Sequence, residues 1–134
     1  MKGSCLCGST SYEIRPPFRL FQYCHCSRCR KFTGSAHAAN LFVPPEQFRW
    51  LGGEECVARF DVPGAKYLTT AFCRQCGSSL PWVVKGGRHV VVPAGTLDED
   101  PGVRPQQSIF WGSRASWCPE SGELPKHEAL PGAR

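Results

Sequence analysis

The sequence predicts a mainly β fold of small sheets, and two observations support this fold class. Short runs of apolar or β-branched residues dominate, whereas few segments show the apolar period of an amphipathic helix. Glycine and proline, with 14 and 12 positions, separate these runs, as expected for a chain with many turns. Short strands with this punctuation are typical of all-β domains. Because 134 residues is an ordinary domain size, we expect residues 1–134 to form a single domain.

Nine segments are expected to form strands, each bounded by residues that favour turns. In chain order they are 10–14, 19–23, 38–43, 48–51, 56–60, 67–72, 80–85, 89–93 and 108–111. The segment Lys85-Gly86-Gly87-Arg88 lies between two apolar runs and predicts a hairpin turn. Pro81 lacks a backbone N–H, so its strand is expected to lie at a sheet edge or to carry a bulge. One helical turn is expected from Ser27 to about Phe32, with Gly34 ending it.

The large aromatic residues and the C-terminal tail have simple structural interpretations. The aromatic residues expected in the core, rather than on a recognition platform, are Phe42, Trp50, Phe60 and Trp82. The tail from Ser116 is rich in proline and glycine and is expected to be irregular, with Trp111 and Trp117 able to pin it to the core.

The composition bears on the compartment and on the partners. No apolar run approaches the roughly 20 residues of a membrane span, and the N-terminal segment lacks the apolar core of a secretory signal. Nine cysteines in such a chain are expected to bind metal rather than to form disulfides, which favours the cytoplasm.

The net charge of +5 has its excess at the front of the chain, where residues 1–31 hold six basic residues against Glu13 alone. A basic front can attract nucleic acid or a small anion, although a solvated basic face is the plainer interpretation. These residues are not interleaved with an aromatic platform, so nucleic acid is disfavoured as a partner.

Seven of the nine cysteines fall into three tight clusters, namely Cys5-x-Cys7, Cys24-x-Cys26-x-x-Cys29 and Cys73-x-x-Cys76. Thiols that recur at such spacing are suited to a soft cation, and tetrahedral thiolate sites favour zinc. A structural zinc takes four ligands. Seven thiols therefore predict one complete site and one three-cysteine site with an open position, which is typical of catalytic zinc.

The complete site is expected to combine the first and third clusters. The segment Phe72-Cys73-Arg74-Gln75-Cys76-Gly77 has the shape of a zinc knuckle, in which a C-x-x-C turn directs two sulfurs to one metal. Cys5 and Cys7 could supply the other two ligands, and they are again followed by a glycine. A metal held in this way would tie the N-terminus to the middle of the domain.

The middle cluster of Cys24, Cys26 and Cys29 is predicted to be the second, catalytic zinc site. Three thiolates on Zn²⁺ leave a formal charge of about −1, and an incoming thiol would lose its proton on coordination. The neighbouring basic residues would offset this charge and are predicted to bind substrate carboxylates; they are Arg28, Arg30 and Lys31.

A closed second site is the alternative, because structural zinc sites are four-coordinate as a rule. The candidate fourth ligands are His25, Cys56, Cys118 or a remote histidine. His25 is the weakest of these, since a side chain between two ligands should point away from the metal that they share. Cys56 lies in an apolar run and is expected to be a buried core thiol. No motif surrounds His37, His89 or His127, and none of them is predicted to be a ligand.

These clusters, in this order, resemble the glutathione-dependent formaldehyde-activating enzyme family, which also includes centromere protein V. The matching stretches are Gly3-Ser4-Cys5-Leu6-Cys7-Gly8 with Tyr12-Glu13, Cys24-His25-Cys26-Ser27-Arg28-Cys29-Arg30-Lys31 with Gly34, Phe72-Cys73-Arg74-Gln75-Cys76-Gly77, and Gly95-Thr96-Leu97-Asp98. The piece from Ile109-Phe110 through Ser113-Arg114-Ala115 to Trp117 also resembles the C-terminal segment of the family. Family members often carry a histidine just before this Ile-Phe pair, where this chain has Ser108.

The resemblance implies a β-tent fold of small antiparallel sheets around two zinc sites. It implies a structural zinc on Cys5, Cys7, Cys73 and Cys76, and a second zinc, linked to activity, on Cys24, Cys26 and Cys29. The family reaction joins glutathione to formaldehyde, giving S-hydroxymethylglutathione, and is classed with the carbon–sulfur lyases for the reverse step.

The predicted function is therefore that of a zinc-dependent carbon–sulfur lyase acting on the adduct of glutathione, or a related thiol, with formaldehyde or another aldehyde. Two alternatives stay open. One is a non-enzymatic zinc module that binds a protein or a nucleic acid, and the other is a zinc-stabilised scaffold with both sites closed.

Overall fold

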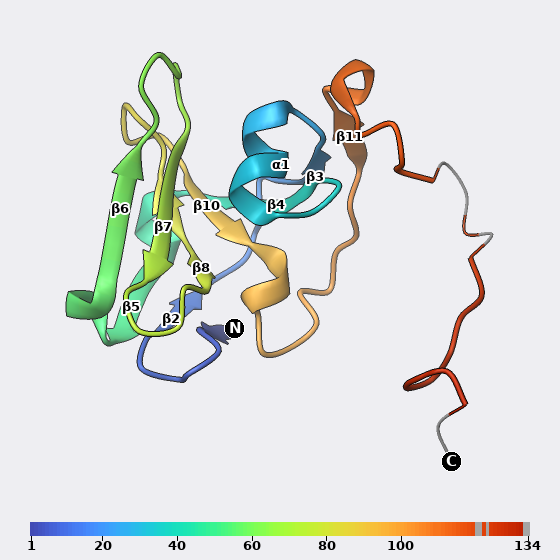
Figure 1. Cartoon of the computed structure of the whole chain (residues 1–134). Helices are drawn as coiled ribbons and strands as arrows, with labels where there is room; N and C mark the ends of the chain where they lie inside the picture. Colours follow the sequence, from blue (N-terminus) through green and yellow to red (C-terminus); the bar gives the residue numbers. More distant parts are fainter. Residues whose placement is uncertain (120–121, 123, 133–134) are drawn as a thin grey trace.

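Strands in three small sheets dominate the computed structural model, which describes residues 1–119, 122 and 124–132 (Figure 1). In chain order the strands are β1 (Lys2–Ser4), β2 (Ser11–Ile14), β3 (Leu20–Cys24), β4 (Ala38–Val43), β5 (Phe48–Gly52), β6 (Val57–Asp61), β7 (Thr69–Cys73), β8 (Ser79–Leu80), β9 (Trp82–Val83), β10 (Val90–Pro93) and β11 (Gln107–Ile109). The helix α1 (Ser27–Thr33) is accompanied by short 3₁₀ helices η1 (Pro45–Gln47), η2 (Glu54–Cys56), η3 (Ala94–Thr96) and η4 (Trp111–Ser113). The predicted mainly β fold is confirmed.

The three sheets have the strand orders β1-β2-β5, β11-β3-β4-β10-β9 and β6-β7-β8. Their pairings are antiparallel except that β11 runs parallel to β3. A parallel neighbour needs a long crossover connection. The segment from β4 to β10 lies between these two strands in the sequence and provides the connection, so β11 returns beside Cys24.

The five-stranded sheet is buried on both faces, and β10 shows this best. Val91 packs into one apolar cluster with Leu80 and Trp82, whereas Val90 and Val92 pack into another. Successive side chains of a strand point to opposite faces, so the three consecutive valines of β10 pack into two different apolar clusters. This sheet is therefore the central layer against which the other two are placed.

Pro81 divides the predicted strand 80–85 into two. β8 pairs with β7 in one sheet, and β9 pairs with β10 in another, so the chain changes sheets at the proline. The reason is that Pro81 cannot donate a backbone hydrogen bond to either ladder. The hairpin predicted at residues 85–88 does connect β9 to β10, with Gly87 N donating to Val84 O at 2.9 Å.

The helix α1 follows the prediction to within one residue. Cys26 caps its N-terminus, because the Cys26 Sγ accepts a hydrogen bond from the backbone N–H of Cys29 at 3.3 Å. Gly34 ends it in the left-handed conformation, with φ of 65°, which favours glycine. In Figure 1 the helix stands between the sheet of β6 and β7 on one side and β11 on the other.

Three packing predictions need correction. Phe60 on β6 is 54% exposed because little of the chain packs on its face of the strand, although Trp82 is buried and Phe42 and Trp50 are partly buried as expected. Cys56 is only half-buried, in the short helix η2. Trp117 is 68% exposed and does not pin the tail. None of the helices in the described part of the chain is long and apolar enough to cross a membrane.

Candidate metal centres and the pocket beside them

The first group of thiols brings together Cys5, Cys7, Cys73 and Cys76, whose Sγ atoms all lie within 4.8 Å of one another. The sulfurs of Cys5 and Cys7 are 3.6 Å apart, and those of Cys7 and Cys73 are 3.9 Å apart. Four thiolates at the usual Zn–S distance of about 2.3 Å form a tetrahedron with edges of about 3.8 Å. The donor set therefore fits a tetrahedral zinc ion.

Two similar turns present these thiols. Gly8 N donates to Cys5 O at 3.0 Å, and Gly77 N donates to Cys73 O at 2.8 Å. Both glycines are left-handed, with φ of 78° and 75°, and this conformation is costly for other residues. Each cysteine pair thus depends on the glycine that follows it.

Hydrogen bonds favour the thiolate form of two members of this group, Cys76 and Cys5. The hydroxyl and backbone of Ser78 lower the pKa of the Cys76 thiol to about 5. At Cys5 burial acts to raise the pKa, but hydrogen bonds from the Thr10 backbone and the Ser9 hydroxyl outweigh it and lower the pKa to about 7. Since the thiolate is the metal-binding form, the loop around each pair is suited to hold a cation.

The second group consists of Cys24, Cys26 and Cys29, again with all Sγ atoms within 4.8 Å of one another. Cys24 ends β3, where Ala38 of β4 and Ile109 of β11 pair with it on either side. The hydrogen bond from Cys29 is the main cause that lowers the pKa of Cys24 to about 6. The same contact, together with burial, raises the pKa of Cys29.

No fourth cysteine, histidine or carboxylate joins the second group within the described residues. The candidates weighed from the sequence lie elsewhere. His25 is 2% exposed, and its ring packs edge-on against Trp111 at 4.9 Å and lies 5.0 Å from His37. Three thiols with no further side chain match the open arrangement expected from the sequence, and a metal at this site stays a prediction.

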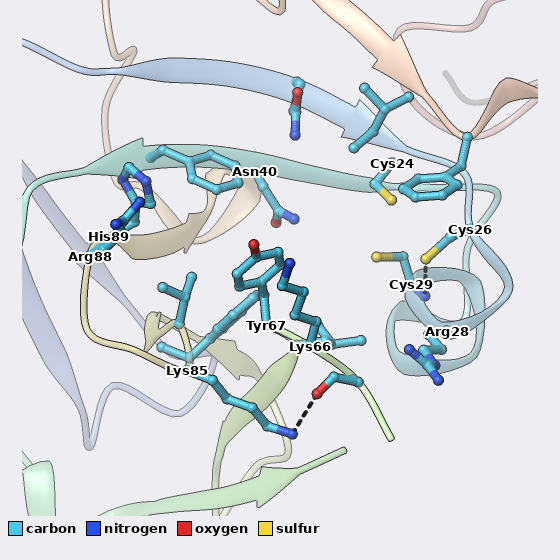
Figure 2. A pocket seen from close by; sticks show the side chains of 18 residues that line it. Cys24, Cys26, Arg28, Cys29, Asn40, Lys66, Tyr67, Lys85, Arg88 and His89 are labelled. Atoms are coloured by element: carbon cyan, nitrogen blue, oxygen red, sulfur yellow. Dashed lines mark hydrogen bonds between the residues drawn. The ribbon is translucent and has the colours of Figure 1, made fainter. Parts of the chain in front are cut away.

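A cavity of about 550 Å³ opens beside the three thiols, which belong to its lining (Figure 2). This volume is in the range of small-molecule sites. Much of the wall is apolar and comes from β4, the segment before β7 and the β9–β10 hairpin, including Phe42, Leu68, Trp82 and Val84. Figure 2 shows Arg28 at the thiol end, Arg88 and His89 at the opposite end, and Lys66 and Tyr67 between them.

Apart from the thiols, the charged side chains that line this pocket are basic. Its lining includes Arg28, Lys66, Lys85 and Arg88, and no Asp or Glu among the described residues. The Lys85 ammonium is already held by the backbone oxygens of Val62 and Ala65, both at 2.9 Å. The other three cations are therefore the ones best placed to meet an anionic ligand.

The basic residues predicted to bind substrate are separated by the fold. Arg28 lines the pocket, whereas Arg30 and Lys31 are not in its lining. Lys31 instead lines a neighbouring apolar groove with Phe32 and Phe60. An α-helix turns by 100° per residue, so consecutive side chains on α1 cannot all face one cavity.

Sequence reasoning missed several polar residues of the pocket, among them Asn40, Lys66, Arg88 and His89. The only available signal was the hairpin at residues 85–88, which predicts a turn but not the cavity that its side chains line. His89 was not predicted to be a metal ligand, and in the structure it belongs to neither thiol group.

Among the proteins that this chain resembles are one curated protein and one solved structure. A protein of Halomonas elongata, whose name provisionally identifies it as a glutathione-dependent formaldehyde-activating enzyme, is 31% identical over 91 residues. That alignment covers 62% of this chain and 55% of the relative, so the chain spans about half the length of the curated relative that it matches. A crystal structure of a Rhodobacter sphaeroides protein superposes with a TM-score of 0.61 and 25% identity, covering 81% of this chain and 98% of the other.

Family membership follows from a match over most of the sequence. Residues 1–113 match the profile of the family described as glutathione-dependent formaldehyde-activating enzyme. The matched range contains both groups of thiols and every residue of the pocket lining. The chain therefore belongs to the glutathione-dependent formaldehyde-activating enzyme family.

Proposed function

We propose that this chain is a zinc-dependent enzyme of the carbon–sulfur lyase type, which forms and cleaves the adduct of glutathione, or a related thiol, with formaldehyde or another aldehyde. The observation that carries the proposal is the group of Cys24, Cys26 and Cys29 at one end of a cationic pocket. The family match and the name of the Halomonas relative support glutathione and formaldehyde as the substrates.

Two zinc ions belong to the proposal, one for each thiol group. Cys5, Cys7, Cys73 and Cys76 would hold the structural ion, and Cys24, Cys26 and Cys29 would hold the ion at the reaction site. When bound, a zinc ion at the second site would supply an open coordination position and lower the pKa of a thiol. All nine cysteines are free, and thiolate ligands need a reducing compartment, for which we propose the cytoplasm.

The chemistry itself is an addition without oxidation. The substrate sulfur attacks the carbonyl carbon, a carbon–sulfur bond forms, and the π electrons of the carbonyl move to its oxygen. The proton given up by the thiol ends on that oxygen, and the reverse step breaks the same carbon–sulfur bond. No oxidant or reductant is needed.

The residues of the chain orient the reactants for this step. Arg28 lies at the thiol end and can bind a substrate carboxylate through its guanidinium fork. The polar ends of Lys66 and Tyr67 point into the middle of the pocket (Figure 2), where both can donate hydrogen bonds. The apolar wall restricts water around the reacting atoms, which strengthens these polar contacts.

The test of this proposal is the substitution Cys26→Ser. Serine is itself a preferred N-cap residue, so α1 should keep its start while the second group loses one of its three thiols. We expect the rate of adduct formation, measured by NMR exchange between glutathione and formaldehyde, to fall to the uncatalysed background. The far-UV and near-UV dichroism should stay unchanged, and the zinc content should fall by one ion per chain.

The matched control is Cys118→Ser, which removes a thiol that belongs to neither group and donates a hydrogen bond to Pro119 O at 3.7 Å. This variant should keep the rate and the zinc content of the wild type. A rate of adduct formation that is unchanged in Cys26→Ser would contradict the proposed mechanism.

A further inference from the structure

The end of the pocket far from the thiols is built on the β9–β10 hairpin. Arg88 and His89 lie there, at the opposite end from the three cysteines (Figure 2). The hairpin is closed by Val84 N donating to His89 O at 3.0 Å and by Gly87 N donating to Val84 O at 2.9 Å. Two backbone hydrogen bonds thus hold these residues at a defined place in the cavity.

Arg19 of the segment before β3 determines the tautomer of His89. Its Nη1 donates to Arg88 O and lies 2.9 Å from His89 Nδ1. A guanidinium has no acceptor, so Nδ1 must accept this hydrogen bond and the ring proton must lie on Nε2. Burial, followed by the charges of Arg19 and Arg88, lowers the pKa of His89, so the ring is neutral at neutral pH.

The orientation of the ring is also constrained by packing. Phe42 of β4 packs edge-on against His89, with ring centroids 5.8 Å apart. Within the described part of the chain, neither the Arg88 guanidinium nor His89 Nε2 has a hydrogen-bond partner. The lining at the far end of the pocket therefore includes a guanidinium and a neutral ring with one N–H donor, and no carboxylate among the described lining residues.

We propose that Arg88 and His89 form a subsite for a carboxylate of the thiol substrate, and that Arg19 is a positioning residue that holds His89 as the Nε2–H tautomer. A carboxylate accepts hydrogen bonds from both groups, and the guanidinium adds charge. This inference rests on the proposed function and specifies the substrate class. The substrate is a peptide-like thiol whose carboxylate is remote from its sulfur, because in free cysteine the two groups are too close to reach both ends of the pocket.

The subsite is tested by calorimetric titration of the zinc-loaded protein with glutathione. The variants are Arg88→Gln and His89→Phe, and the second keeps a planar ring against Phe42. We expect Arg88→Gln to weaken binding by about tenfold or more, as for loss of a charge-assisted hydrogen bond. The control Arg49→Gln removes the same charge from β5, where Arg49 pairs with Glu13 at 2.9 Å outside the pocket, and should change the affinity less than twofold.

Two shorter thiols identify the carboxylate that is bound. γ-Glutamylcysteine lacks the glycyl carboxylate of glutathione, and cysteinylglycine lacks the γ-glutamyl one. One of these two thiols lacks the carboxylate that the subsite binds. For that thiol, Arg88→Gln should leave the affinity unchanged. An equal loss with all three thiols, or no loss with glutathione, would overturn the subsite.

The role of Arg19 has a spectroscopic test. In the wild type the ¹⁵N shifts of His89 should show a protonated Nε2 and an unprotonated Nδ1. Arg19→Met should give a mixture of tautomers and weaken glutathione binding to the extent of His89→Phe, whereas Arg19→Lys should restore both. Unchanged ring shifts in Arg19→Met would refute the positioning role.

Failure of the subsite and failure of the proposed function can be told apart. If glutathione binds with the expected dependence on Arg88 but no aldehyde adduct is formed faster than background, the subsite stands and the enzymatic proposal fails. If the adduct is formed but its KM is insensitive to Arg88 and His89, the enzymatic proposal stands and the subsite is wrong.

Discussion

Removing the zinc ion proposed for the group of Cys5, Cys7, Cys73 and Cys76 is expected to unfold the chain. This group joins the loop after β1 to the turn after β7, across more than half of the sequence. Cys5 and Cys73 also lie in the apolar cluster with Leu80 and Trp82, so loss of the cation that they share would disturb the core directly. Structural zinc contributes about 10–16 kcal/mol in small domains, which matches or exceeds the roughly 5–15 kcal/mol stability of a typical domain.

The measurement is near-UV dichroism during titration with a chelator, with zinc release followed by a colorimetric indicator. We expect the tertiary signal to disappear as the last equivalent of zinc leaves. Cys73→Ser should show the same loss without chelator, whereas Cys118→Ser should not. Retained near-UV dichroism after complete removal of the metal would contradict a structural role for this site.

Gly53→Ala is expected to destabilise the fold by more than about 3 kcal/mol, above the usual range for a point substitution. Gly53 is left-handed, with φ of 74°, and a Cβ placed there would overlap the backbone carbonyl of Ser9. The side chain of Thr10 also donates to Gly53 O at 3.0 Å. A methyl group would therefore push away the loop that carries Cys5 and Cys7, and backbone atoms cannot yield as a flexible side chain would.

Gly102→Ala is the matched control, because Gly102 has nearly the same conformation, with φ of 77°, and no atom lies within 4 Å of the place that an alanine methyl group would take. It should cost only about 1–2 kcal/mol, the penalty for a left-handed alanine. Urea denaturation of both variants, with zinc content measured at each step, gives the comparison. Equal stabilities of the two variants would show that the overlap with Ser9 is relieved at no cost.

Much of the fold was predictable because its signals are local. Gly34 ends α1 within one residue of the expected place, and the glycines at 86 and 87 form the hairpin expected of them. Phe60 is exposed, against the prediction, because the burial of a strand residue depends on whether another segment packs on its face of the strand; Leu80 and Trp82 also lie on edge strands but are covered in this way. Which face of a strand is covered depends on packing between distant segments, which local patterns do not contain.

The parallel pairing of β11 with β3 is another feature that no local pattern predicts. The two strands are separated by more than eighty residues, and their contact depends on how the intervening sheets stack. This pairing places Ile109 beside Cys24. Ile109 and Phe110 then form part of the pocket lining.

By itself, the sequence determined the three local clusters of cysteines, since thiols two or three residues apart can share a metal only through a tight local turn. It also determined the glycines that permit those turns and the helix that carries Cys29. Only the tertiary structure decided which cations face the three thiols. Arg88 and His89 reach the pocket from a hairpin about sixty residues after Cys29, whereas Arg30, adjacent to that cysteine, does not line it. The physical reason is that ligand spacing is a property of the local backbone, but a binding pocket is enclosed by segments that meet only when the core forms.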